Sequence, residues 1–428
     1  MIPYFLNANL YPPGSVISDS TAFFSAVSTN TGNSYITYAM LRLMGKNSEY
    51  LNRKTSHGNL YAAPLDPAEA ERINAEFSHV FFTLQDHIRL DFEDRFYVHA
   101  CDALERLHLP IIAYSLGANN TSGVSLAKNL SPAKRRFLAM LSKKCAVIGI
   151  RGAFTASILD ELGIHNYHIT GCPSYFERGP NRCIPHRPWS DALDVGATGF
   201  FSHPDRQRLR YFLQSEVIPA KIVYFTDALL KEDYASCGDL IRKPYMDSLS
   251  AAIKRGNIAL YADMDAWRDD IANHVNFVIG TRLHGAIMAL NAGRPAIVTN
   301  IDMRSAETCK FLGIPYYPRG SGLPFNLRAI YETIDIENIN RRYGALYDNF
   351  VEWLHRNELP SPAITPSVAC SAVRLPINPL EVQTERLNAM RHTIKSRRIK
   401  RLWAKFRPRT GLVVKGRALY AKWGWRLF

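Results

Sequence analysis

An arginine and a histidine stand two residues apart in the segment NFVIGTRLHGAIMALNAGRPAIV, residues 276–298, among small and apolar side chains. The guanidinium of Arg282 is a planar fork of donors that fits a carboxylate or a phosphate. The imidazole of His284 titrates near neutral pH, so it can act as an acid or a base. Together they could bind an anion and move a proton beside it. The alternative is that Arg282 caps a neighbouring element and His284 is a satisfied helix histidine.

The flanking pattern predicts how this pair is positioned. Residues 277–279 read as a buried strand, and residues 283–291 have apolar positions three and four apart, which predicts a helix. Gly293 ends that helix, and a second apolar run follows at 296–298. The resulting strand, helix and strand place Arg282 and His284 at the helix N-terminus. In an open α/β sheet this position is the ligand crevice, and the helix end favours an anion.

Other predicted strands also end in polar residues. An apolar run before residue 28 leads through a glycine turn into a predicted helix with one apolar face. The strands VFFTL, AVIGI and VGATGFF each run into a polar turn. Polar strand ends mark the crevice side of a parallel sheet. The candidates of this kind are Asn30, Gly32, His87, Arg89, Arg151, His203 and Arg206.

This alternation of strands and helices predicts an α/β protein with two Rossmann-like domains that face a cleft. The stretch PSYFERGPNRCIPHRP has four prolines and marks the region between the domains. The predicted divisions are an N-terminal domain at 1–180, a linker at 181–193, a C-terminal domain with the Arg-Leu-His segment at 194–355, an extended connection at 356–385 and a basic helical tail at 386–428.

The Asp-Met-Asp sequence at 263–265 could hold a divalent metal on a nucleotide-sugar. It stands, however, where a helix N-cap is expected, and aspartate is a preferred cap. We therefore interpret it as a cap and predict no metal site. A Gly-x-Gly-x-x-Gly fingerprint and a Walker-type loop are both absent from the sequence, so a dinucleotide or ATP site has no support from a motif.

The composition predicts a globular protein of the cytosol. The chain has 428 residues, 47% of them hydrophobic, which is enough for two cores. It has no apolar run of the roughly 18 to 20 residues that span a membrane, and its first residues do not resemble a signal peptide. Its seven cysteines are scattered without a Cys-x-x-Cys pair, so we expect them to be reduced and structural.

The formal charge of +14 is concentrated in the tail. Residues 386–428 hold 14 of the 52 Lys and Arg and no Asp or Glu, which leaves 38 basic and 38 acidic residues in the rest. Apolar stripes that include Trp403 and Trp423 run beside these charges, a pattern typical of membrane-surface helices. A nucleic-acid arm needs the same charge but has less use for the stripes, and a merely solvated tail is the plainer alternative. We predict a peripheral location at the inner face of the cell membrane.

Several segments together resemble the polysaccharide pyruvyl transferase family. They are VIGTRLHGAIMALNAGRPAIV, IGIRGAFTASILDELGI, TGCPSYF and NTGNSYITYAMLRLMG, and they lie between about residues 23 and 317. The resemblance implies a glycosyltransferase-B-like fold. It also implies catalytic roles for His284 and Arg282, and donor binding by Arg282, Arg151, Thr281 and Gly280. The sequence departs from the family's pattern at Asn33 and Cys172, where aspartate is frequent.

The resemblance implies transfer of pyruvate from phosphoenolpyruvate to a sugar, as a ketal, on a surface or exopolysaccharide precursor. No cofactor is expected, because phosphoenolpyruvate is the donor substrate. The acceptor would be a saccharide, lipid-linked and presented at an anionic membrane surface bound by 386–428, and nucleic acid is not an expected partner. The alternatives are a nucleotide-sugar-dependent glycosyltransferase of the same architecture and a non-catalytic, membrane-associated assembly factor.

Overall fold

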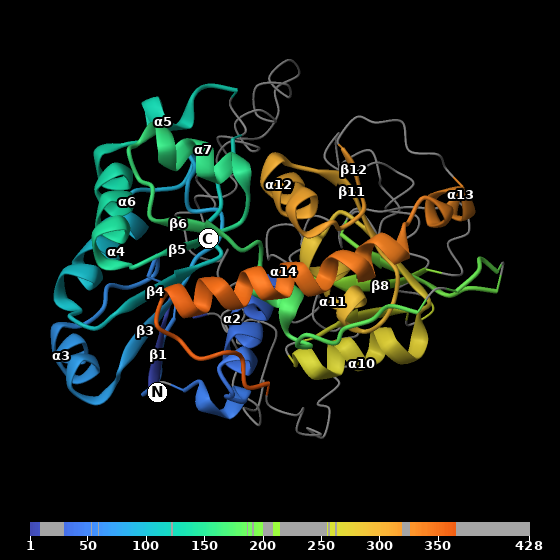
Figure 1. Ribbon diagram of the computed structural model, residues 1–428, viewed down its shortest axis with the longest axis horizontal. Coiled ribbons are helices and arrows are strands. Elements are labelled where there is room, and N and C mark those ends of the chain that lie inside the picture. The colour runs from blue at the N-terminus through green and yellow to red at the C-terminus, as the bar shows by residue number, and fades with distance from the viewer. Residues whose placement is uncertain are drawn as a thin grey trace, which may run out of the picture.

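The computed structural model describes residues 1–8, 30–52, 54–58, 60–120, 123–185, 187–190, 192–199, 209–214, 255, 257–261, 263–318 and 326–364. It is a mixed α/β fold, and the pairings between its described strands are parallel. The predicted α/β class is confirmed at this level. Figure 1 shows one group of strands in the left half of the view and the other in the right half.

The first sheet is built from the N-terminal part of the chain. Its strands are β1 (Pro3–Leu6), β2 (Ser56–His57), β3 (His79–Thr83) and β4 (Ile111–Tyr114), in the order β2-β1-β3-β4. A smaller pair, β5 (Ile148–Ile150) and β6 (Tyr167–Ile169), continues beside it, because a parallel bridge joins Leu116 after β4 to Ile150 in β5. The residues that follow β3, β4 and β5 therefore share one edge.

The second sheet contains β7 (Val195–Thr198), β8 (Leu209–Leu213), β9 (Ile258–Leu260), β10 (Phe277–Gly280), β11 (Ala296–Ile301) and β12 (Tyr316–Pro318). Their order is β12-β11-β10-β7-β8-β9. The chain thus starts at β7, moves outward to β9, and returns to the other side of β7 at β10. Strand order reverses between β7 and β10, which is where open α/β sheets bind their ligands.

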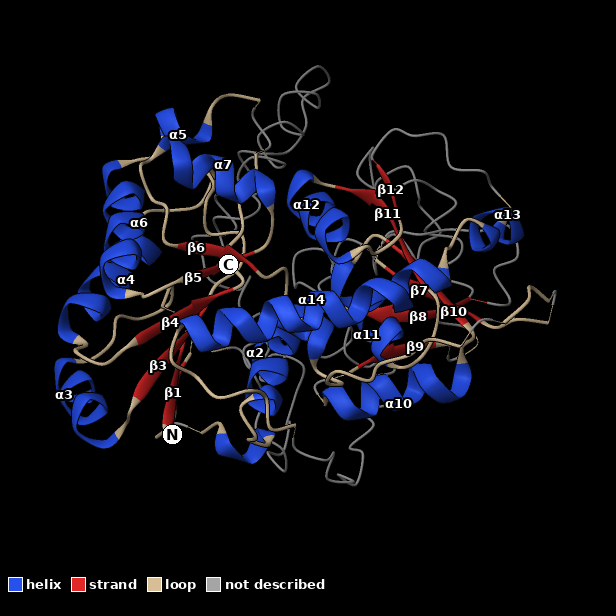
Figure 2. Cartoon of the chain, in the orientation of Figure 1, coloured by secondary structure: helices blue, strands red, loops and turns tan. Residues whose placement is uncertain are grey.

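Helices surround both sheets, as Figure 2 shows. With the first sheet lie α3 (Pro67–Glu76), α4 (Arg95–Arg106), α5 (Leu126–Asn129), α6 (Pro132–Lys144) and α7 (Ala153–Glu161). With the second lie α10 (Met264–His274), α11 (Leu283–Asn291), α12 (Met303–Leu312) and α13 (Leu327–Glu332). Short 3-10 turns form η1 (Ser48–Tyr50) and η2 (Pro173–Phe176). None of the helices in the described ranges is both long and apolar enough to cross a membrane.

Helix α2 (Thr31–Leu43) lies between the two sheets, where it packs against η2 and α11. Successive residues of a strand face opposite sides of its sheet, so Phe81 and Phe82 of β3 enter different hydrophobic clusters. The cluster around Phe82 lies on the side of α4 and α6. The cluster around Phe81 continues through Tyr35 of α2 to Phe277 of β10. Helix α2 therefore joins both sheets in one core.

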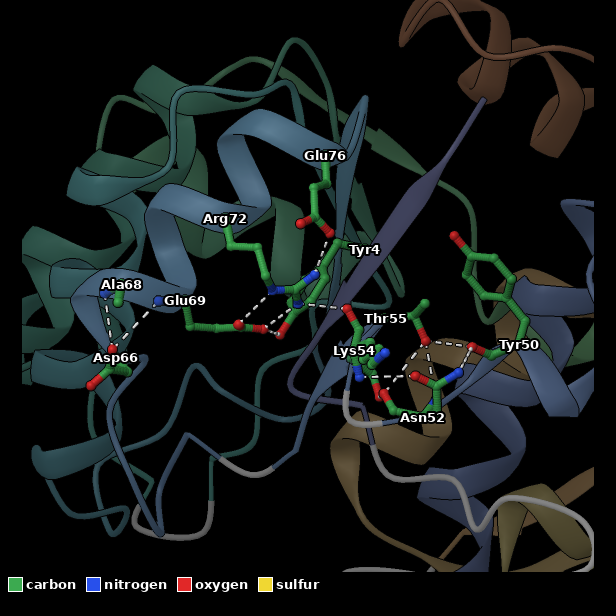
Figure 3. Close-up of polar contacts among 11 residues, drawn as sticks. Tyr4, Tyr50, Asn52, Lys54, Thr55, Asp66, Ala68, Glu69, Arg72 and Glu76 are labelled. Atoms are coloured by element: carbon green, nitrogen blue, oxygen red, sulfur yellow. Dashed lines mark hydrogen bonds and ion pairs between the residues drawn. The ribbon is translucent and has the colours of Figure 1, made fainter.

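An arginine fixes α3 to the edge of the first sheet (Figure 3). Arg72 donates to both carboxylate oxygens of Glu69, at 2.8 and 2.7 Å, and to the carbonyl oxygen of Lys54 at 2.6 Å. The hydroxyl of Tyr4 in β1 donates to Glu69 at 3.0 Å. This network ties the loop before β2 to α3, away from the strand ends that form the site below.

Helix α14 (Ile336–Arg356) follows the second sheet and crosses the face of the molecule to the first (Figure 1). The indole Nε1 of Trp353 donates to the carbonyl oxygen of Val147 at 3.0 Å, and Asn357 donates to the same oxygen at 3.1 Å. A Cβ on Gly149 in β5 would lie 3.0 Å from the Trp353 ring. The last described helix thus covers β5, a strand more than 200 residues earlier.

The structure confirms several local predictions and adds elements that they lacked. Helix α11 has the predicted bounds, and Asp263 caps α10, since its side chain accepts from Asp265 N and Ala266 N. Strand β1 and helix α14 were not predicted. The predicted strand before residue 28, the residues His203 and Arg206, and the tail 386–428 lie outside the described residues. The domain divisions stay a prediction.

Candidate functional site

The ends of β7 and β10 determine where Arg282 and His284 lie. Gly280, the last residue of β10, has a φ of +156°, and a Cβ there would collide with the carbonyl oxygen of Thr198 at the end of β7. That oxygen accepts a hydrogen bond of 2.8 Å from Thr281 N. The tight crossing allows α11 to begin at once, with Arg282 as its N-cap and His284 in its first turn. Glycine is required at 280 because only its backbone fits this approach.

The side chain of Arg282 lies along the turn after β7. A Cβ on Gly199, which has a φ of +70°, would lie 2.9 Å from Arg282 Cγ and 3.2 Å from its Nε. Thr281 Oγ1 is close to the same point. Arg282 and Thr281 are partly exposed. Arg282 therefore stands at the helix N-terminus, as predicted, and the structure places that position at the strand-order reversal of the second sheet.

His284 is packed against the start of α2. It is 9% exposed, and a Cβ on Gly32 would lie 2.9 Å from His284 Nδ1. Asn30 caps α2, since its Oδ1 accepts from Gly32 N at 2.9 Å. The N-terminal ends of α2 and α11 therefore meet at this imidazole. Helix N-terminal ends carry partial positive charge, so their meeting favours an anion.

The imidazole of His284 is neutral in the absence of ligand. Burial lowers its pKa well below the usual value, and the positive charges of Arg151 and Arg304 lower it further. Its other nitrogen, Nε2, lies 3.6 Å from the thiol sulfur of Cys172. Cys172 is fully buried at the start of η2. The electrostatic surroundings of His284 are cationic, which disfavours imidazolium and favours a bound anion.

Arg151 reaches the same place from the end of β5. It is 4% exposed, and its Nε donates to Ser115 Oγ at 3.2 Å. Ser115 follows β4 and has a φ of +63°, an uncommon conformation for a residue with a Cβ. Gly117 leaves room for the arginine, because a Cβ there would lie 2.8 Å from Arg151 Cδ. The structure therefore brings together Arg151 and His284, which are 133 residues apart in the sequence.

His87 and Arg89 lie in the same region, but their polar groups are engaged. His87 packs against the Phe96 ring, 4.3 Å between ring centres, and its Nδ1 accepts from Gln85 N at 2.9 Å. Burial lowers the pKa of His87 to about 4, and nearby Arg151 adds to this effect. Arg89 donates to both oxygens of Asp91, at 2.6 and 2.7 Å. The side chains of His87 and Arg89 are therefore better placed to support the site than to contact a ligand.

Helix α12 supplies two residues that the sequence reasoning missed. Arg304 Nη1 donates to Asp86 at 2.6 Å, which links the second sheet to the loop after β3. Burial would raise the pKa of Asp86, but Arg304 and Arg89 hold it below its usual value, so Asp86 is ionised. Glu307 accepts from Thr155 N at 2.9 Å and from Thr155 Oγ1 at 2.6 Å, and so caps α7. The polar residues that follow the strand at 296–301 could have indicated Arg304 and Glu307 as site residues from the sequence.

Three buried hydroxyl oxygens near these helix starts have no hydrogen-bond partner within the described chain. They are Thr31 Oγ1 and Ser34 Oγ in the first turn of α2, and Thr198 Oγ1 at the end of β7. A buried polar atom without a partner costs roughly 1–3 kcal/mol, so it requires an explanation. Unpartnered hydroxyls at a helix start and at a strand end are suited to the oxygens of a ligand.

Comparison with known proteins identifies a family. A family model described as polysaccharide pyruvyl transferase matches residues 30–302. No curated protein sequence matches the chain. Similar solved structures include Alr3699/HepE of Anabaena in complex with UDP, at 10% identity and a TM-score of 0.38 over 92% of this chain and 100% of that one. The glycotransferase of kitacinnamycin has 12% identity and a TM-score of 0.31 over 82% and 86%. SnogD of Streptomyces nogalater has 12% identity and a TM-score of 0.25 over 91% and 98%.

Proposed function

This chain belongs to the polysaccharide pyruvyl transferase family, and from that premise we propose that it transfers pyruvate from phosphoenolpyruvate to a sugar as a ketal. The sugar would belong to a precursor of a surface polysaccharide. Two Rossmann-like domains facing a cleft, in a glycosyltransferase-B-like arrangement, would suit this reaction, with donor and acceptor entering between them.

One observation carries the proposal: a neutral, buried histidine stands among cations at the meeting of two helix starts. The charged groups that shift the pKa of His284 are Arg151 and Arg304, and Arg282 occupies the N-cap position of the helix that carries His284. Phosphoenolpyruvate carries its carboxylate and its phosphate on the same carbon. Two buried or half-buried guanidinium groups and two helix starts match such a compact, highly charged anion.

The reaction needs proton transfer at the same place. The donor's methylene carbon gains a proton, the adjacent carbon is attacked by one sugar hydroxyl and then by a second, and phosphate leaves. Each hydroxyl gives up its proton. One of these two protons balances the proton gained by the methylene carbon, and the other leaves with phosphate. Entry of a polyanion offsets Arg151 and Arg304, which raises the pKa of His284 from its depressed position. We assign His284 to proton transfer and Arg282 with Arg151 to donor binding, with Gly280 and Thr281 forming the turn that holds Arg282.

The test is a donor screen with purified protein and a saccharide acceptor. Release of phosphate from phosphoenolpyruvate, followed by phosphorus NMR, supports the proposal, and release of nucleoside diphosphate from a nucleotide-sugar would replace it with the glycosyltransferase alternative. His284→Ala should abolish transfer, whereas His165→Ala, at a side chain that is 71% exposed, should not. Normal turnover by His284→Ala would remove the histidine from the mechanism.

Arg282→Lys separates charge from geometry. Lysine keeps the positive charge but loses the two-pronged donor geometry of the guanidinium, so KM for phosphoenolpyruvate should rise. Unchanged kinetics would mean that Arg282 only shapes the turn after β10.

We also propose that residues 386–428 hold the enzyme at the inner face of the cell membrane, next to a lipid-linked acceptor. The support is compositional: 14 basic residues, no acidic residue and tryptophan-bearing apolar stripes. Each basic residue near an anionic leaflet contributes about 1 kcal/mol. Co-sedimentation of the full chain and of 1–385 with anionic or neutral liposomes tests this. Equal pelleting of both forms would assign the tail to another partner.

A further inference from the structure

A continuous line of polar contacts connects Arg151 to His284. Arg151 Nε donates to Ser115 Oγ at 3.2 Å, and Ser115 Oγ donates to Cys172 Sγ at 3.8 Å. Cys172 Sγ then lies 3.6 Å from His284 Nε2. Exposed fractions along the line are 4%, 0%, 0% and 9%. Water therefore does not compete with these contacts.

The chemistry of the groups gives this line a direction. A guanidinium can only donate, so Ser115 Oγ must accept from Arg151 and has its own hydrogen left for Cys172 Sγ. The thiol sulfur has a second neighbour, Ser174 Oγ, at 3.0 Å. The thiol hydrogen can therefore go either to Ser174 Oγ or to His284 Nε2.

The two arrangements differ in whether each buried hydroxyl and thiol hydrogen has an acceptor. If the thiol donates to Ser174, the hydroxyl hydrogen of that fully buried serine has no acceptor within the described residues. If Ser174 donates to the sulfur and the thiol donates to His284 Nε2, the hydrogens of Ser115, Ser174 and Cys172 each have an acceptor, and only the ring hydrogen of His284, on Nδ1, is left for a ligand. Buried donors in proteins are almost always paired, so the second arrangement is favoured.

We propose that Cys172 is the positioning residue of His284, whose thiol donates to Nε2 and so keeps the ring proton on Nδ1, facing the start of α2. The neutral ring then presents an N–H to that side. The opposite tautomer would present a lone pair there, which repels an anion. Cys172 thereby selects the form of His284 that can donate a hydrogen bond to an anionic substrate.

The consequence for the reaction rests on the proposed function, but the tautomer itself does not. Without the thiol, Nδ1–H and Nε2–H forms would interconvert. If the competent form falls to between half and a fifth of the population, KM for phosphoenolpyruvate rises about two- to fivefold. The expected change is in KM for the donor, because His284 can still transfer a proton once the donor is bound.

The deciding experiment is nitrogen NMR of protein labelled in histidine, with the His284 signals assigned by their loss in His284→Gln. Wild type and Cys172→Ser, in which a hydroxyl replaces the donating thiol, should show Nδ1 protonated and Nε2 unprotonated. Cys172→Ala should show averaged signals. Cys145→Ala, which removes another buried cysteine in the first half of the chain, should match wild type.

Kinetics on the same variants complete the test. Cys172→Ala should raise KM for the donor, and Cys172→Ser should restore it. A wild-type signal with Nε2 protonated, or a single Nδ1–H form in Cys172→Ala, would overturn the assignment. Because the spectra need no substrate, they decide the tautomer even if the donor screen rejects phosphoenolpyruvate.

Discussion

Replacing Gly32 with alanine should reduce activity while leaving the protein folded. A Cβ at Gly32 would lie 2.9 Å from His284 Nδ1 and 3.0 Å from His284 Cβ, whereas ordinary contact begins at 3.4 Å. The imidazole and the first turn of α2 must therefore move apart by about 0.5 Å, the difference between 3.4 and 2.9 Å. A misplacement of about 1 Å can cost a hundredfold in rate, so half that shift predicts roughly a tenfold fall in kcat.

The stability terms at Gly32 partly offset each other. Alanine is favoured over glycine in a helix by up to about 1 kcal/mol. Overpacking a filled site costs about 1–3 kcal/mol. The free energy of unfolding should therefore fall by no more than about 3 kcal/mol, which leaves the variant folded.

Gly344 is the matched control. It lies within α14, and a Cβ there meets nothing within 4 Å. Gly344→Ala should therefore raise the free energy of unfolding by about 0.5–1 kcal/mol and leave kcat unchanged. Urea unfolding and steady-state phosphate release, measured on both variants, provide the comparison. Wild-type kcat in Gly32→Ala, with both variants folded, would refute the claim that α2 positions His284.

Three further predictions concern residues around the site. His87 has a pKa of about 4 in the folded protein against an ordinary 6.5, so the unfolded chain takes up this proton first as pH falls. The free energy of unfolding should be highest above pH 6.5 and drop by at most about 3 kcal/mol between pH 6.5 and pH 4. Urea titrations at several pH values should show a weaker pH dependence for His87→Phe. Glu307→Gln leaves one of the two Thr155 donors without an acceptor and should lower the free energy of unfolding by about 1–2 kcal/mol. An unchanged midpoint in urea unfolding would show that Glu307 does not cap α7. Trp353→Ala should cost about 3–5 kcal/mol, because the indole is fully buried, and a loss below 1 kcal/mol in the same assay would show that α14 does not hold β5.

Local signals explain what could be predicted from the sequence. Helix α11 was predicted with its bounds because a strand, a glycine and an apolar repeat follow one another within 20 residues, and Gly293 adopts the left-handed conformation expected after a helix. Asp263 was identified as a cap for the same reason: its partners are two and three residues away. Helix α14 also has a clear apolar repeat, from Ile336 to Leu354, so the sequence pattern was sufficient to predict it although it was not predicted.

The contacts that build the site depend on strand order, which a single sequence does not display. Cys172 and His284 are 112 residues apart, and Arg304 and Asp86 are 218 apart. They meet because β4 and β5 share one edge of the first sheet while β7 and β10 flank the reversal in the second. The residues at strand ends could thus be named, but not which of them would become partners. The strand-end pattern alone did not distinguish His87 and Arg89 from Arg151, which only the family resemblance singled out.

The bond between Trp353 and Val147 spans 206 residues, and it has a consequence for synthesis of the chain on the ribosome. At about 5–20 residues per second, roughly 10 to 40 seconds separate the appearance of β5 from that of the helix that covers it. During that interval the nascent first half exposes Gly149 and its apolar neighbours. Folding of this half is therefore completed late, by the last helix that the structure describes. Chaperone capture and aggregation should both concentrate in this interval rather than after release of the finished chain.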